Sequence, residues 1–377
     1  MKTMIDILNV GNQEQFHSSM IAWLLDNQGE HGLGDSFISA FADILSKTKN
    51  GDPTLKNKLA CSKSYVVQTE KVNGKSRYDI EIEIDGFKVI IENKTKSIGA
   101  KAQCANYLQN NGNCSGSAVI VPLGFCDVSF SSDVHQQYPF ISYQTLLQVI
   151  KRLLPNVTNK EYYYLIKHYI TYLDIEFDIL NQIHKSFFAG QSNNQTNLSK
   201  FLTQTKQVRE NNVRFYNLYY LGQLEKYLLH TPEFNGTKWT LDKDNQSGPW
   251  IADYEKVSPK FTFSGPYKKL QKDFDVYMWF HLQLENEGIF SSSNNDVGNF
   301  HLRCCKSKSA KGSNVDIVKA FKERFTTGTQ GVLLSSRISN NWNTFMLASQ
   351  KISYDQLESH KMGSLMKDFM SKFGKFI

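Results

Sequence analysis

The stretch YDIEIEIDGFKVIIENK, Tyr78 to Lys94, decides the fold of this chain. At its centre, Asp85-Gly86 favours a two-residue type I′ turn, because both central residues of such a turn need a positive φ. Charged residues alternate with apolar ones on both sides of the turn, which is typical of an antiparallel hairpin. The register that a two-residue turn fixes places Asp79 directly opposite Glu92, with Cβ atoms about 4.5–5.5 Å apart.

Period-two alternation divides the side chains of this hairpin between two faces. The first face is mostly charged and carries Asp79, Glu81, Glu83, Lys88, Ile90, Glu92 and Lys94. The second face is apolar and carries Ile80, Ile82, Ile84, Phe87, Val89 and Ile91. We therefore expect the apolar face to enter the core, and we expect Lys94, on the mostly charged face, to be exposed.

The paired carboxylates make the hairpin a candidate metal site. Asp79 and Glu92, when both are ionised, repel each other unless a cation or a proton lies between them. Mg²⁺ prefers carboxylate oxygens, and Lys94 would place positive charge where an anionic substrate or an attacking water sits. The alternative is a plain antiparallel hairpin whose charges face water.

Motif residues continue on both sides of the hairpin. Asp79 and the run Glu92-Asn93-Lys94 at the end of a hydrophobic strand are followed by Gln103 in the helical pattern AKAQCANYL. With the helical segment from Asn12 to Leu45, this set resembles the PD-(D/E)XK nuclease superfamily over about residues 10–150, although Tyr78 replaces the proline expected before the aspartate. The resemblance implies an α/β, restriction-endonuclease-like fold with a mixed central sheet flanked by helices.

The resemblance also implies a ligand set for the metal. Asp79, Glu92 and the backbone carbonyl of Asn93 would hold one or two Mg²⁺ ions, for which Mn²⁺ can substitute. Glu14, in the first turn of the first long helical pattern, is the candidate third carboxylate. The other interpretation of Glu14 is a glutamate favoured at a helix N-terminus by the helix dipole.

Two further residues complete the catalytic set that the resemblance implies. Lys94 would position or deprotonate the attacking water, and Gln103 would orient the phosphate or the water. Gln103 shares a helix face with Tyr107, one turn further on, and is otherwise a surface glutamine. The set predicts a Mg²⁺-dependent nuclease, with a DNA endonuclease favoured over an enzyme that acts on RNA.

The chain of 377 residues is long enough for more than one hydrophobic core. We expect the nuclease core over residues 1–155 and a helical extension that packs on it over residues 156–230. Short strand patterns separated by turn-rich runs then predict a basic α+β domain over residues 231–377, which would bind nucleic acid or a partner.

Basic residues point to a polyanionic partner, with nucleic acid first. Residues 296–377 contain 13 Lys and Arg against 6 Asp and Glu, so their net charge of +7 equals that of the whole chain. The candidates for phosphate contact are Arg77, beside the metal site, and Arg303, Lys306, Lys308 and Lys311. The alternative is a solvated surface that contributes only solubility.

The remaining features of the sequence limit the class of protein and its expected location. The sequence shows no signal peptide and no membrane-length apolar run, and its six cysteines lack zinc-type spacing, so we expect a cytoplasmic protein that does not bind membranes. Cleavage of both strands of a duplex with one active site per chain would favour a homodimer. The resemblance implies a role in restriction or anti-phage defence, with a possible partner protein. The alternative function is a catalytically idle nuclease-fold module that binds nucleic acid or assembles with a partner.

Overall fold

The computed structural model contains two compact units, residues 1–179 and residues 180–377. It describes residues 3–51, 53–61, 65–73, 76–96, 104, 106–107, 118–126, 129–130, 132–188, 206–229, 240–241, 260–264, 276–284, 296–306, 315–316, 318–319, 323, 333–334 and 344–374. The sequence places domain boundaries near residues 155 and 230, whereas the units meet within one long helix.

The first unit is built on a five-stranded mixed sheet in the order β1-β2-β3-β4-β5. Its strands are β1 (Val66–Asn73), β2 (Ser76–Ile84), β3 (Phe87–Lys94), β4 (Ala118–Gly124) and β5 (Ile141–Ser142). The first three strands are antiparallel, and β4 and β5 join β3 in parallel. The predicted α/β class with a mixed central sheet is confirmed.

The β2–β3 hairpin has the predicted turn and register. Asp85 and Gly86 have φ angles of 47° and 78°, as a type I′ turn requires. Ile80 pairs with Ile91, as the two-residue turn predicts. Asp79, one residue before this pair, lies close enough to Glu92 for their charges to interact.

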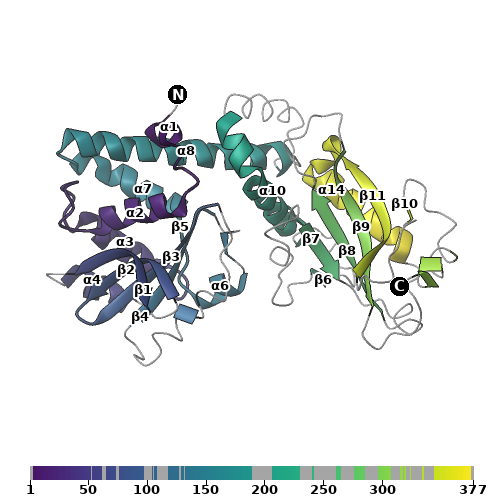
Figure 1. The fold of residues 1–377 in the computed structure, drawn as a ribbon, viewed down its shortest axis with the longest axis horizontal. Coiled ribbons are helices and arrows are strands. Elements are labelled where there is room, and N and C mark those ends of the chain that lie inside the picture. The colour runs from purple at the N-terminus through teal and green to yellow at the C-terminus, as the bar shows by residue number, and fades with distance from the viewer. Residues whose placement is uncertain are drawn as a thin grey trace. The chain divides into compact units, whose positions relative to one another are not determined.

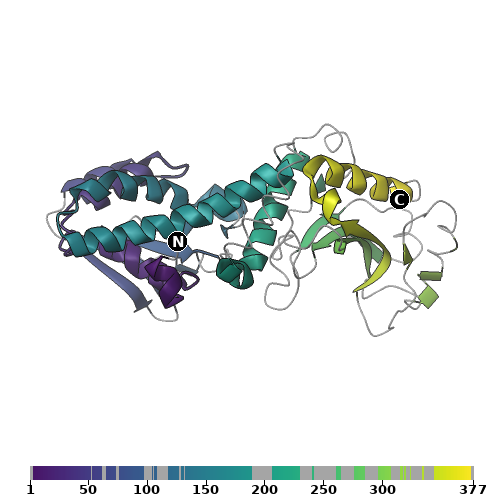
Figure 2. The same ribbon diagram turned by 90° about the horizontal axis from the view of Figure 1, so that it is seen from above.

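Helices flank this sheet. They are α1 (Met4–Leu8), α2 (Glu14–Leu25), α3 (Ser36–Lys47), α4 (Thr54–Cys61), α6 (Ser132–Gln137), α7 (Tyr143–Leu153) and α8 (Lys160–Phe188), with a 3₁₀ turn at Leu154–Asn156. Helices α2, α7 and the first part of α8 lie on one side of the strands (Figure 1). Figure 2 shows α7 and α8 side by side, and an ion pair of 2.5 Å between Lys151 and Asp174 joins them.

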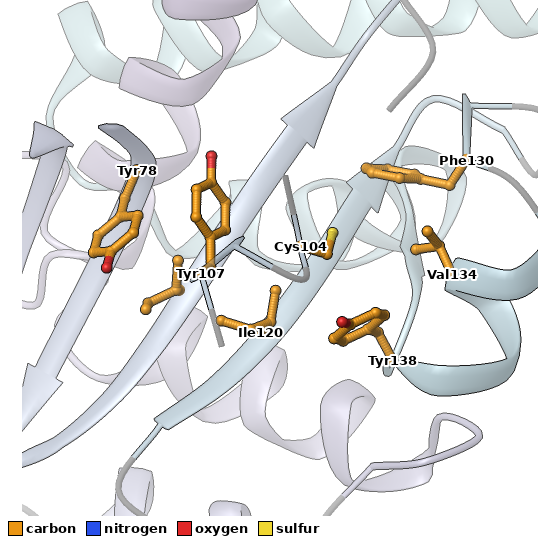
Figure 3. Packing of buried hydrophobic residues seen from close by; sticks show 8 residues of the cluster. Tyr78, Cys104, Tyr107, Ile120, Phe130, Val134 and Tyr138 are labelled. Atoms are coloured by element: carbon orange, nitrogen blue, oxygen red, sulfur yellow. The ribbon is translucent and has the colours of Figure 1, made fainter. Parts of the chain in front are cut away.

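Part of the charged face of the hairpin is also covered, so the prediction that Lys94 is exposed is wrong. A second cluster of buried side chains lies against it, and Figure 3 shows the rings of Tyr107 and Tyr138 beside Ile120 of β4. Cys104, Tyr107 and Val134 of α6 supply this cover from sequence that follows the hairpin. As a result the side chains of Glu92 and Lys94 are buried, with exposures of 1% and 8%.

Strand β1 compensates one of the buried charges on this face. Lys71 forms an ion pair with Glu81, which is 1% exposed, and Lys88 lies 3.4 Å from the same carboxylate. A buried carboxylate needs such partners, since an uncompensated charge in the interior costs several kcal/mol, about 3–5. The two lysines therefore allow an acidic strand to lie inside the protein.

The second unit contains the end of α8, helix α10 (Lys206–Leu229) and a six-stranded sheet in the order β10-β11-β9-β8-β7-β6. Its strands are β6 (Thr240–Leu241), β7 (Lys260–Ser264), β8 (Val276–Leu284), β9 (Asp296–Lys306), β10 (Leu333–Leu334) and β11 (Thr344–Ser353). A 3₁₀ turn (Tyr354–Leu357) leads to α14 (Ser359–Gly374), which packs on the sheet through Phe300 and Phe369. The Tyr220 hydroxyl of α10 donates to the carbonyl of Leu357 at 2.7 Å.

His17 of α2 is buried between the first helices and α8. Its Nδ1 lies 3.0 Å from the hydroxyl of Tyr169, and its Nε2 lies 3.0 Å from the carbonyl of Gly11. Burial lowers the pKa of His17 from 6.5 to about 4, since the charged imidazolium loses its hydration. The folded protein therefore favours the neutral ring.

This shift gives a testable dependence of stability on pH. Below the unfolded pKa of 6.5 the unfolded chain binds a proton that the folded protein resists, so stability falls as the pH drops toward 4. From about pH 7.5 to about pH 5 the wild type should lose about 2 kcal/mol more unfolding free energy than His17→Gln, measured by urea denaturation. Equal losses in the two proteins would contradict the assignment.

Candidate functional site

Asp79 lies in β2, one residue before the part that pairs with β3, and β3 holds its carboxylate. The backbone N–H of Asn93 donates to Oδ2 of Asp79 at 2.7 Å. Burial, and then the charge of Glu92, raise the pKa of Asp79 to about 7. The carboxyl group is therefore in a place where its charge is disfavoured unless a cation is near.

Glu92 faces Asp79 from β3 and is almost completely buried. The Tyr107 hydroxyl donates to its Oε2 at 2.5 Å. Nζ of Lys94 lies 2.8 Å from Oε1 in an ion pair, and no donor among the described residues is aligned to hydrogen-bond this buried oxygen. Oε1 is thus the atom of Glu92 that retains capacity for a further ligand.

Lys94 forms ion pairs with acidic residues of two different elements, Glu92 of β3 and Glu14 of α2. Its Nζ is 2.8 Å from Glu92 and 3.5 Å from Oε2 of Glu14. Burial alone would lower the pKa of Lys94, but the charges of Glu92 and Glu14 outweigh burial and raise it above its usual value. Lys94 is therefore a fixed cation at neutral pH.

Glu14 is the first residue of α2, and the motif strand binds its backbone. The side-chain amide of Asn93 donates to the carbonyl of Glu14 at 3.3 Å and to the Ser18 hydroxyl at 2.9 Å. The carboxylate of Glu14 faces Lys94, as the ion pair requires. Two segments 80 residues apart in the sequence thus meet at one site.

The other predicted site residues have different positions. Arg77 is 68% exposed, and its Nε lies 2.8 Å from Glu70. Gln103, Lys308 and Lys311 lie outside the described residues. Arg303 and Lys306 belong to β9 in the second unit, where the structure describes their backbone alone.

Comparison with protein families identifies the first unit. Residues 4–171 match the model of the PD-(D/E)XK nuclease superfamily. This part of the chain belongs to that superfamily. Its members are nucleases, which hydrolyse phosphodiester bonds and generally use divalent metal ions. No match was found among curated proteins or solved structures.

The superfamily's metal chemistry fits part of this site. Within the described ranges, no three His, Cys, Asp or Glu side chains are grouped to hold an ion, and the carboxylate of Glu14 pairs with Lys94, so the role of Glu14 as a third ligand stays a prediction. The remaining donors are the opposed carboxylates of Asp79 and Glu92 and the carbonyl of Asn93, a set of hard oxygen ligands that suits Mg²⁺. The raised pKa of Asp79 and the incompletely satisfied Oε1 of Glu92 both favour a cation here.

The sequence predicts the acidic pair but not all of the residues that hydrogen-bond to the site. Tyr107 shares a predicted helix face with Gln103, and this i, i+4 spacing is the signal that Tyr107 belongs to the site. Tyr143, whose hydroxyl donates to Oδ1 of Asn93 at 2.8 Å, gives no such signal, because it lies 50 residues away.

None of the helices that the structure describes has the length and apolar character needed to cross a membrane.

The pKa of Asp79 predicts how metal affinity depends on pH. Protons compete with a cation for this carboxylate below about pH 7, so the apparent affinity for Mn²⁺ should be about tenfold higher at about pH 8 than at about pH 6. Isothermal titration calorimetry in two buffers of different ionisation enthalpy would also detect the released proton. Asp79→Asn should bind Mn²⁺ more weakly and without this dependence, and a wild-type affinity that does not change with pH would contradict the site.

Proposed function

We propose that the protein is a Mg²⁺-dependent nuclease, with DNA favoured over RNA and internal cleavage over trimming from ends. The observation that carries the proposal is the buried set formed by Asp79, Glu92 and Lys94, in which two carboxylates and an ammonium group meet within one superfamily core. The basic character of residues 296–377 supports a nucleic acid as the partner.

The metal would be held by Asp79, Glu92 and the backbone carbonyl of Asn93, with Glu14 as a neighbouring charge. When bound, Mg²⁺ supplies Lewis-acid polarisation of the phosphate and a lower pKa for the attacking water. The N–H of Asn93 orients Asp79, and Tyr107 orients Glu92. Their hydrogen bonds fix both carboxylates before substrate arrives, which lowers the reorganisation needed during the reaction.

Lys94 acts in this proposal as a cation and not as a base. A general base must release its proton near the working pH, and a lysine whose pKa is raised stays protonated there. Its ammonium group instead stabilises the negative charge that develops on the phosphate and positions the water.

The remaining roles follow from resemblance and charge. Gln103 orients the phosphate, and Arg77, Arg303, Lys306, Lys308 and Lys311 contact the nucleic-acid backbone. A homodimer would supply two active sites for the two strands of a duplex, and restriction or anti-phage defence is the biological role that fits such an enzyme.

Cleavage assays test the function. Purified protein with supercoiled plasmid, linear duplex, single-stranded DNA and RNA should cleave DNA in Mg²⁺ or Mn²⁺ and leave it intact in EDTA. Asp79→Asn and Lys94→Gln should each lose at least about 100-fold of the rate. Lys47→Ala, which removes an exposed lysine paired with Asp43, should stay within about twofold of wild type.

Stability separates loss of chemistry from loss of fold. Asp79→Asn should be at least as stable as wild type, because it removes a charge that the folded protein disfavours. Lys94→Gln leaves Glu92 without its cation and should cost about 3–5 kcal/mol. Full activity in Asp79→Asn would refute the nuclease site. Metal-independent binding without cleavage would instead support the idle module, an interpretation favoured by the ion pair with Lys94, which already balances the charge of Glu92.

A further inference from the structure

Asn93 lies between the two motif residues Glu92 and Lys94, and its side chain points away from them into the core. It is completely buried, and its amide uses one acceptor and two donor positions. Oδ1 accepts from Tyr143 of α7, and Nδ2 donates to the carbonyl of Glu14 and to Ser18 of α2. A buried amide bound in this way has a single favourable rotamer.

The contacts of Asn93 belong to a closed ring of buried groups. The Tyr143 hydroxyl is also hydrogen-bonded to that of Tyr169 in α8, and Tyr169 is hydrogen-bonded to Nδ1 of His17 in α2. His17 lies one helical turn after Glu14, so the ring returns to the helix from which it started. All of these side chains are essentially inaccessible to solvent.

The first turn of α2 is attached to the motif strand through Glu14. The carbonyl of Glu14 accepts from Asn93 and from the Ser18 hydroxyl at 3.0 Å. Gln13, at the N-cap position, makes no side-chain capping hydrogen bond that would hold this turn in addition. The carboxylate of the same residue reaches Lys94.

We propose that the side chain of Asn93 is a positioning group that fixes Glu14 against the motif strand, and that Tyr143, Tyr169 and His17 hold Asn93 in the required rotamer. The expected effect on cleavage rests on the proposed nuclease function. The fixed position of Glu14 rests on the geometry alone. Through Asn93, the ring sets the position of Glu14 relative to Lys94 and the direction of the N–H that binds Asp79.

The test uses Tyr143→Phe, which removes the hydroxyl at the centre of the ring and keeps the aromatic body. Loss of a group that orients a metal site typically costs 10–100-fold, so kcat for DNA cleavage should fall about tenfold while KM changes by less than about twofold. Tyr220→Phe is the matched control, because it removes an equally buried hydroxyl from the second unit. It should keep the wild-type kcat.

A double-mutant cycle distinguishes positioning from general destabilisation. If Tyr143 acts through Asn93, Tyr143→Phe should change kcat by less than about twofold once Asn93→Ala is present. The same tenfold loss with and without the Asn93 side chain would overturn the proposal.

Hydrogen exchange provides a readout that needs no activity. The N–H of Asn93, which donates to Asp79, should exchange about fivefold faster in Tyr143→Phe and at the wild-type rate in Tyr220→Phe. An unchanged exchange rate would contradict the proposal that the ring fixes Asn93, even if the enzyme cleaves DNA. Faster exchange in a protein that cleaves nothing would support the ring and reject the nuclease proposal.

Discussion

The repulsion between Asp79 and Glu92 is the constraint around which the first unit is built. A two-residue turn fixes the register that brings the two carboxylates together, and both are largely withdrawn from water. The protein meets the resulting cost with the ammonium group of Lys94, the hydroxyl of Tyr107 and the backbone N–H of Asn93. Charge, geometry and burial are thus coupled at the end of one hairpin.

Local turn chemistry made this hairpin predictable from sequence. Asp85-Gly86 tolerates positive φ at both positions, and the alternating pattern on either side leaves one register that keeps the isoleucines on the core face. The helical segment predicted from Asn12 to Leu45 is likewise present, as α2 and α3, because its apolar residues recur with the period of a helix.

The environment of the site was not predictable in the same way. The alternation of its strand predicts that Lys94 is exposed, whereas Lys94 is buried and Cys104, Tyr107 and α6 pack on this face of the sheet from elsewhere in the chain. His17 and Tyr169, which are 152 residues apart, meet through tertiary packing alone. Strand β11 contains two register shifts, which interrupt the period-two pattern that marks a strand in the sequence.

A direct test of the central account is the position of a bound metal ion. Crystals grown with Mn²⁺ and measured at the manganese absorption edge should show an anomalous peak between the carboxylates of Asp79 and Glu92, and the peak should vanish in Asp79→Asn. A wild-type crystal with no peak at this pair, in a protein that cleaves DNA with Mn²⁺, would contradict the claim that these two carboxylates form the metal site.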